Sequence, residues 1–168
     1  MSGARVRSFD PIAGKNAQIL VLGSMPGRKS LAARQYYAHQ QNVFWRIIGE
    51  LLELDSSSPY EGRVRALKAA RIALWDVLHS CVRQGSLDTK IERETEVAND
   101  FRKFFRGHGK ITHVFFNGAK AEASFKRHVA RKIGAVPIIF ARLPSTSPAN
   151  ASVPFDRKLE AWRAILRS

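Results

Sequence analysis

Polar and aromatic side chains that could act on a ligand gather in two stretches far apart in the chain. The first, GSMPGRKSLAARQYYAHQQNVFW (23–45), contains Tyr37, His39 and Asn42. The second, LPSTSPAN (143–150), offers three hydroxyls and an amide. Such groups can stack on a planar ring, orient a water molecule or bind phosphate oxygens. GSMPG matches neither the G-x-G-x-x-G pattern nor the P-loop, so neither nucleotide fingerprint applies.

The charge balance points to a polyanionic partner. Among 168 residues, 28 Lys and Arg face 14 Asp and Glu, a net charge of +14. Each phosphate neutralised by Lys or Arg releases counterions, so nucleic acid is the favoured partner, ahead of an acidic membrane surface. A basic protein without such a partner would show the same balance. With 45% hydrophobic and 25% charged residues, the composition is globular and predicts one domain over 1–168.

Few residues are suited to metal or disulfide chemistry. Cys81 is the only cysteine, which excludes an internal disulfide, a zinc ribbon and a four-cysteine iron–sulfur cluster. The histidines show no H-E-x-x-H spacing, so we expect no metal and no cofactor. No apolar run approaches the roughly 20 residues of a membrane span, and no signal-peptide pattern is present. We therefore expect no membrane association and a cytoplasmic location.

Four short apolar runs predict buried strands of a parallel sheet, at 18–23, 71–77, 112–117 and 136–142. Apolar residues at helical spacing lie between and after them, and we expect a further helix at 62–70. The helical faces comprise Phe44, Ile47, Ile48, Leu51 and Leu52; Val97, Phe101, Phe104 and Phe105; Ala121, Phe125, Val129 and Ile133; and Leu159, Trp162 and Leu166. This alternation predicts a three-layer α/β/α fold with a central four-stranded, mainly parallel sheet.

In such folds, ligands bind at the carboxyl ends of the strands. The segments that follow the four predicted strands are GSMPG, WDVLHSC, NGAKA and LPSTSPANA. Both stretches with candidate chemistry are therefore expected at the same edge of the sheet.

The first stretch resembles motif 1 of the uracil-DNA glycosylase superfamily, and LPSTSPAN resembles its second motif. GSMPG followed by YYAHQQNVFW is similar to the mismatch-specific uracil/thymine glycosylases, but Met25 stands where those carry an asparagine. No Asp or Glu lies nearby, Leu143 replaces the histidine of several branches, and the lone cysteine excludes the iron–sulfur branches. The remaining pattern looks like the hypoxanthine-DNA glycosylase branch, in which the implied catalytic residue is Asn42.

The resemblance implies a monofunctional DNA glycosylase that hydrolyses the N-glycosidic bond of a flipped deaminated base, hypoxanthine before others, in base-excision repair. Asn42 would orient the water and favour a cationic sugar; alternatively, it caps the following helix. His39 would contact phosphate or order the water, or is structural. Asp76 would read the base or activate water, or caps the next segment.

The same resemblance implies a base pocket and a DNA-binding surface. Tyr37 would stack on the base, and Asn117 would contact it or cap a helix. The residues expected in the pocket are Gly23, Ser24, Met25, Gly27, Tyr37 and Asn117. Those expected to contact phosphates or form a wedge in the DNA are Ser145, Thr146, Ser147, Pro148, Ala149, Asn150, Arg28 and Lys29. For the serines, Thr146 and the residues after them, an ordinary polar turn is the alternative.

The expected partner is double- or single-stranded DNA containing a damaged base, bound by a monomer. A mismatch-type uracil/thymine glycosylase is one alternative function, and a non-catalytic nucleic-acid-binding module is another. Neither motif contains an obvious lysine nucleophile, and Lys120 in NGAKA is the nearest candidate.

Overall fold

The most apolar runs of the chain form a central parallel sheet in the computed structural model, which describes residues 3–168. Its strands pair in the order β3-β2-β6-β7. They comprise β2 (Ile19–Gly23), β3 (Ile72–Asp76), β6 (His113–Asn117) and β7 (Ile139–Leu143). The four predicted strands and the α/β class are confirmed. All residues of β2 and β3 are buried, which explains why both read as uniformly apolar.

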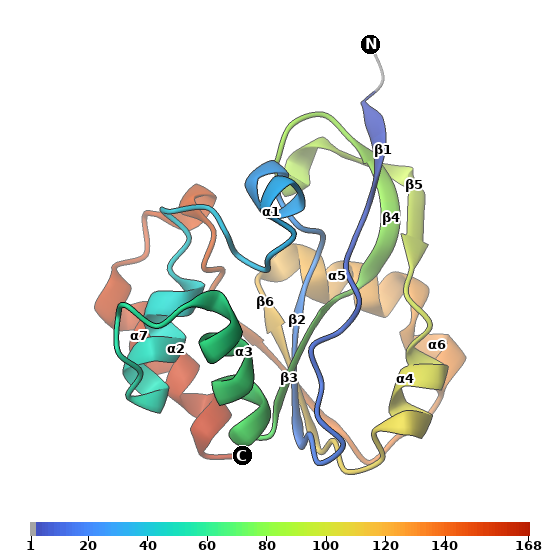
Figure 1. Ribbon diagram of the computed structural model, residues 1–168. Helices are drawn as coiled ribbons and strands as arrows, with labels where there is room; N and C mark the ends of the chain where they lie inside the picture. The colour runs from blue at the N-terminus through green and yellow to red at the C-terminus, as the bar shows by residue number, and fades with distance from the viewer. Residues whose placement is uncertain (1–2) are drawn as a thin grey trace.

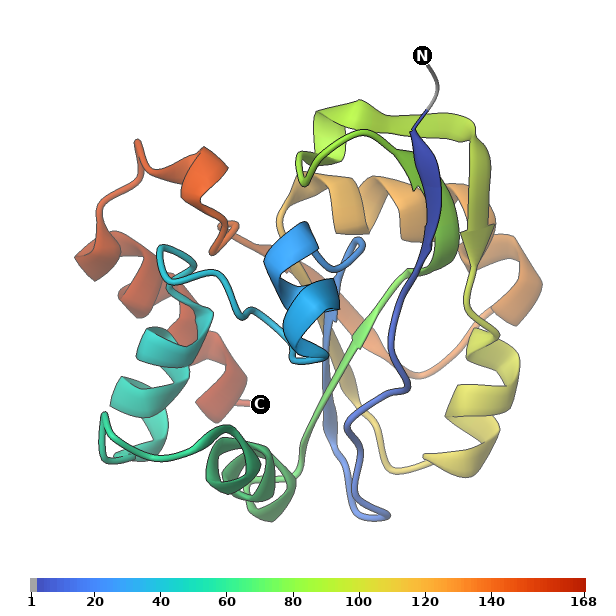
Figure 2. The ribbon, with the colours of Figure 1, turned by 45° about the horizontal axis from the view of Figure 1, so that its top comes forward.

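Helices cover both faces of this sheet, as Figures 1 and 2 show. The longer ones are α2 (Phe44–Leu52), α3 (Tyr60–Ala69), α4 (Phe101–Gly107), α5 (Ala119–His128) and α7 (Phe155–Trp162). The shorter ones are α1 (Arg28–Ala33), α6 (Ala130–Ile133) and the 3₁₀ turns η1 (Asp88–Lys90), η2 (Pro148–Asn150) and η3 (Arg163–Leu166).

Alternate residues of each central strand face different cores. Val21 of β2 packs with residues of α2, α3 and α7, whereas Leu20 and Leu22 pack with residues of α4 and α5. The right-handed crossovers of parallel strands place helices on the two faces in this way. The predicted three layers are therefore present, and they fix the carboxyl ends of four strands side by side.

A second sheet was not predicted from the sequence. It is antiparallel, in the order β1-β4-β5, and comprises β1 (Ala4–Arg7), β4 (Leu78–Arg83) and β5 (Ile91–Ala98). The segment expected as a loop after β3 continues into β4 after a single residue, Val77. Val97, expected on a helix, lies in β5 and is 47% exposed. Four of the eight residues of β5 are charged, Glu92, Arg93, Glu94 and Glu96, so no apolar run marks this strand.

Two helix predictions needed correction at their ends. The face that includes Val129 is divided between α5 and α6, although Val129 itself is buried. At the C-terminus, α7 ends at Trp162 and passes into η3. A 3₁₀ turn has three residues per turn, so Ile165 enters the core and Leu166 is left exposed.

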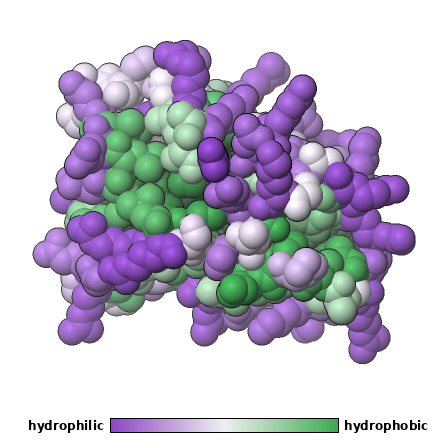
Figure 3. Space-filling model, turned by 90° about the horizontal axis from the view of Figure 1, so that it is seen from below, coloured by the Kyte–Doolittle hydropathy of each residue, from purple (hydrophilic) through white to green (hydrophobic). Residues whose placement is uncertain are grey.

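No helix in the described part of the chain is long and apolar enough to cross a membrane. Figure 3 views the molecule from below, where apolar side chains gather in areas bordered by projecting hydrophilic ones. Exposed apolar side chains of the described residues include those of Ile139, Phe140 and Leu166.

Candidate active site

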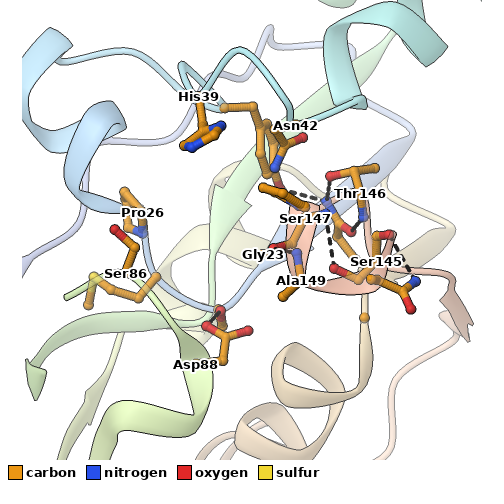
Figure 4. Close-up of a pocket in the computed structure, with 18 of the residues that line it drawn as sticks. Gly23, Pro26, His39, Asn42, Ser86, Asp88, Ser145, Thr146, Ser147 and Ala149 are labelled. Carbon is orange, nitrogen blue, oxygen red and sulfur yellow. Dashed lines mark hydrogen bonds between the residues drawn. The ribbon is translucent and has the colours of Figure 1, made fainter. Parts of the chain in front are cut away.

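A cavity of about 1240 Å³ opens at the carboxyl ends of the central strands. Strand register brings these ends together, because Gly23 pairs with Asp76 and Asn117 pairs with Leu143. Every residue singled out for the site lines this cavity: Gly23, Ser24, Met25, Gly27, Arg28, Lys29, Tyr37, His39, Asn42, Asp76, Asn117, Ser145, Thr146, Ser147, Pro148, Ala149 and Asn150. Two stretches separated by about a hundred residues therefore share one wall (Figure 4).

Asn42 lies directly before helix α2, with its side chain held by the backbone. Its Oδ1 accepts a hydrogen bond from the N–H of Phe44 at 2.9 Å, although the helix N-cap position itself belongs to Val43. The Asn42 N–H in turn donates to the carbonyl of His39 at 2.9 Å. These two bonds fix the amide while leaving one lone pair of Oδ1 for another donor. Capping and contact with a ligand are therefore compatible at this position.

The His39 ring is engaged within its own loop. Its Nδ1 accepts the Gln41 N–H at 3.1 Å. This bond requires a lone pair on Nδ1, so the neutral ring carries its proton on Nε2. In Figure 4, His39 and Asn42 lie on the same side of the cavity.

Asp76 places a buried carboxyl group in the lining of the cavity. The residue is 3% exposed, and Oδ2 is buried without a partner among the described residues. The pKa of Asp76 is raised to about 8, mainly by burial and then by the nearby charge of Asp88, while Arg83 opposes the shift. A carboxyl group of this kind is typical of functional sites, because burial of an unpaired polar group is costly.

The close packing around Gly23 explains why no side chain fits there. A Cβ at this position would lie 2.6 Å from Asp76 Oδ1 and 2.9 Å from Tyr37 Oη. Both distances are shorter than real Cβ contacts. The absence of a side chain at the end of β2 therefore lets the two polar groups approach each other across the floor of the cavity.

Asn117 joins the two motifs through its side chain. Its Oδ1 accepts the Thr146 N–H at 2.9 Å, and its Nδ2 donates to Thr146 Oγ1 at 2.9 Å and to Tyr37 Oη at 3.1 Å. Asn117 does not cap α5, whose N-cap is Gly118. The amide is thus committed to neighbouring residues, and it ties the end of β6 to both loops.

The loop 145–150 is ordered by its own hydrogen bonds. Ser145 Oγ accepts the Ser147 N–H, Ser147 Oγ accepts the Ala149 N–H, and Asn150 Nδ2 donates to the Ser145 carbonyl. Thr146 is 1% exposed, so its hydroxyl, expected to meet a phosphate, is instead buried against Asn117. The exposed residue of this turn is Ala149.

Arg83 and Asp88 support the site but were not anticipated from the sequence. Asp88 accepts a hydrogen bond from Ser24 Oγ at 2.6 Å. Its residue surface is exposed, yet protein atoms surround its carboxyl densely enough for desolvation to raise its pKa. Arg83 is buried beside the first motif, donates to the Pro26 carbonyl at 2.7 Å, and has a lowered pKa because of desolvation. Arg83 ends β4 and Asp88 begins the turn η1 between β4 and β5, a region that no pattern had predicted.

Lys120 is paired rather than free. Its Nζ bonds to Glu96 Oε1, and the other oxygen of Glu96 bonds to His128 Nε2 at 2.7 Å. The Glu96 side chain is fully buried. The amine therefore belongs to a structural cluster between β5 and α5.

Positive charge is exposed at the rim of the cavity, at Arg28, Lys29 and Arg142. Across the described residues, no group of three His, Cys, Asp or Glu side chains is placed to hold a metal ion. The polar lining of the site includes amides, hydroxyls, the His39 ring and the carboxyls of Asp76 and Asp88.

Comparison with known proteins assigns this arrangement to a family. The family model of the uracil DNA glycosylase superfamily matches residues 11–167. A hypoxanthine DNA glycosylase of Methanosarcina acetivorans is 36% identical over 162 residues, which span 96% of this chain and 98% of that protein. A hypoxanthine DNA glycosylase of Methanosarcina barkeri is 40% identical over 116 residues, which span 68% and 72% of the two chains.

A solved structure agrees with these sequence matches. The solution NMR structure of a Methanosarcina acetivorans protein, described as a candidate uracil DNA glycosylase, superposes with a TM-score of 0.79 at 32% identity. The match covers 97% of this chain and 99% of that one. The chain belongs to the uracil DNA glycosylase superfamily.

Proposed function

We propose that this protein is a monofunctional DNA glycosylase that removes hypoxanthine from DNA. The observation that carries the proposal is the meeting of Asn42 and the unpaired Asp76 carboxyl in one cavity at the carboxyl ends of the sheet. Relatives that match most of the chain are hypoxanthine DNA glycosylases, which favours this base over uracil. All groups needed come from one chain, so a monomer suffices.

The proposed reaction breaks the bond between C1′ of the sugar and N9 of the base. The base leaves with the bonding electrons and takes up a proton, and water adds its oxygen to C1′ while losing a proton. Asn42 cannot act as a strong base because its amide is neutral. Its Oδ1, oriented by the Phe44 N–H, accepts a hydrogen bond from the water and stabilises positive charge on the sugar.

Asp76 is proposed to bind the polar edge of the base. Either protonation state offers an oxygen that accepts the N1–H of hypoxanthine. Because its pKa is raised to about 8, the carboxyl is mostly neutral at pH 7 and does not bring a full negative charge against the base.

The pairing of Lys120 with Glu96 favours a water nucleophile over a lysine nucleophile. A lysine that attacks C1′ must be unprotonated and free to reach the sugar. Arg28 and Lys29 at the rim are proposed to contact phosphates, and Pro148 and Ala149 to enter the space left by the flipped nucleotide.

Base release from otherwise identical oligonucleotides tests the proposal. Each carries one hypoxanthine, uracil, xanthine or mismatched thymine, in single- and double-stranded form. We expect hypoxanthine to be released fastest. Release of uracil or thymine alone would support the mismatch-type alternative, and binding without release of any base would leave only a nucleic-acid-binding role.

A further inference from the structure

The orientation of one side-chain amide in the cavity wall is fixed by the backbone. The Thr146 N–H can only donate, so the atom of Asn117 that lies 2.9 Å from it must be the amide oxygen. Nδ2 is then directed to the other side, toward Thr146 Oγ1 and Tyr37 Oη. Unlike a surface asparagine, Asn117 therefore cannot exchange its donor and its acceptor.

This orientation fixes the polarity of the Tyr37 hydroxyl. Nδ2 of Asn117 is a donor, so Tyr37 Oη accepts the bond of 3.1 Å between them. Among the described residues, the hydroxyl proton of Tyr37 has no acceptor of its own. Burial raises the pKa of Tyr37, with the charge of Asp76 as the next cause, so the proton stays on the oxygen.

The hydroxyl lies at the floor of the cavity rather than at its rim. Tyr37 lines the cavity, and its Oη lies across Gly23 from Asp76 Oδ1. The ring of Tyr37 packs against Phe44, with 4.2 Å between their centroids. One face of the ring is thus occupied, and the polar end of the side chain is the part presented beside Asp76.

We propose that Tyr37 recognises deaminated bases by donating its hydroxyl proton to their exocyclic oxygen, with Asn117 as the residue that sets this polarity. The inference rests on the proposed glycosylase function and specifies its substrate class. Hypoxanthine has O6 where adenine has an amino group, and uracil has O4 where cytosine has one. Because the Tyr37 hydroxyl must donate, it forms a hydrogen bond with the exocyclic oxygen of a deaminated base. In adenine or cytosine it would face an amino group, which is itself a donor.

Asp76 completes this recognition. Next to the exocyclic oxygen, hypoxanthine and uracil each carry a ring N–H, whereas adenine and cytosine carry a bare ring nitrogen. A donor from Tyr37 and an acceptor from Asp76 therefore match the paired carbonyl and N–H of a deaminated base. The undamaged base leaves buried polar groups unpaired, which is the strongest basis for rejecting a close analogue.

Binding to uncleavable DNA tests the role of the hydroxyl directly. Two oligonucleotides carry a 2′-fluoro nucleotide, which resists hydrolysis, with either hypoxanthine or unsubstituted purine as the base. Purine has the same rings but lacks both O6 and the N1–H. It therefore forfeits the contacts to Tyr37 and to Asp76, and we expect the wild type to bind the hypoxanthine oligonucleotide more than tenfold more tightly. Tyr37→Phe keeps the ring packed on Phe44 and should reduce this preference about tenfold, the effect of one buried hydrogen bond, while the part due to Asp76 remains.

The variant Asn117→Asp keeps the Tyr37 hydroxyl but changes the direction in which it donates its proton. The aspartate still accepts the Thr146 N–H, but its second oxygen accepts the Tyr37 proton and turns a lone pair toward the base. The preference for hypoxanthine should fall about as far as in Tyr37→Phe although Tyr37 is intact. Thermal melting of each variant checks that it is folded.

A preference for hypoxanthine that is unchanged in Tyr37→Phe, or absent from the wild type, would overturn the inference. Release of hypoxanthine from ordinary deoxyinosine DNA by the wild type, measured alongside, would show that the glycosylase function stands in that event. If the wild type releases no hypoxanthine, the proposed function fails, and the inference fails with it.

Discussion

Asp76 shows how a single residue can reveal a site. Its carboxyl is almost completely buried, and Oδ2 lacks a hydrogen-bond partner among the described residues. A carboxyl group that served only the fold would be expected to have a partner, because an unsatisfied buried polar group costs about 1–3 kcal/mol. This cost points to a ligand that supplies the missing contact.

The raised pKa of Asp76 makes the stability of the fold depend on pH. The carboxyl titrates at 3.8 in the unfolded chain and at about 8 in the folded one, so between these values the folded state holds a proton that the unfolded state has lost. The free energy of unfolding therefore decreases with rising pH, by up to about 1.4 kcal/mol per unit for this group. We expect Asp76→Asn to remove this slope.

Denaturant unfolding at pH 5, 6.5 and 8 measures the effect. Because Asp88 and other groups also titrate, the comparison is between the wild type and Asp76→Asn at each pH. The variant should gain stability relative to the wild type as pH rises. If the free energy of unfolding changed equally with pH in the two proteins, the raised pKa of Asp76 would be contradicted.

Residues of the site could be predicted where they adjoin a recognisable element. Asn42 precedes an amphipathic face, and Asp76 and Asn117 end apolar strands. Asp88 and Arg83 could not be found in this way, because they lie in the second sheet and the turn after it. Their proximity to Ser24 and Pro26 exists only once β4 folds back beside the first motif.

At the scale of elements, β5 and α5 are joined by the buried side chain of Glu96. It bonds to Lys120 and to His128, which both belong to α5. Removal of one partner of a buried carboxyl leaves its charge poorly compensated. Lys120 is 26% exposed, so solvent moderates the loss.

Lys120→Met separates this structural role from catalysis. We expect the variant to lose about 1–3 kcal/mol of stability, measured by denaturant unfolding, and to keep releasing base when assayed below its melting temperature. Borohydride added during the reaction of the wild type should trap no covalent protein–DNA complex, because no imine forms. A trapped complex that disappears in Lys120→Met would instead identify a lysine nucleophile.

Three of the predicted strands have two buried faces. β2, β3 and β6 read as apolar runs because helices cover both sides of the parallel sheet, whereas β7 reads as apolar although Ile139 and Phe140 are exposed. β5 reads as a charged segment because one side of its sheet is solvated, and β1 has only four residues. The change from α-helix to 3₁₀ turn at η3 could not be predicted either, because the apolar residues keep α-helical spacing through Leu166.

For the whole molecule, the charge of +14 should control affinity for DNA. Each phosphate contact contributes about −0.9 to the slope of log K against log salt concentration for double-stranded DNA. We expect Arg28→Gln with Lys29→Gln to reduce the magnitude of this slope by about 1–2, because both side chains are exposed at the rim of the cavity. Binding of undamaged DNA across a series of salt concentrations measures it.

A matched control lies on α6. Arg131 and Lys132 are exposed and follow the C-terminal end of α5, whereas its N-terminal end lines the cavity. Arg131→Gln with Lys132→Gln removes the same total charge away from the proposed DNA path. Equal loss of slope in the two double variants would contradict a defined path and favour nonspecific attraction to the whole surface.

The most direct test of the account is single-turnover release of hypoxanthine by the wild type, Asn42→Ala and Asn42→Ser. Serine keeps an oxygen that can cap α2, whereas alanine loses both the cap and the amide. We predict that release falls about 10²–10⁴-fold in both variants while DNA is still bound. Release at the wild-type rate by Asn42→Ser would show that Asn42 only caps the helix, and would contradict its role at the sugar.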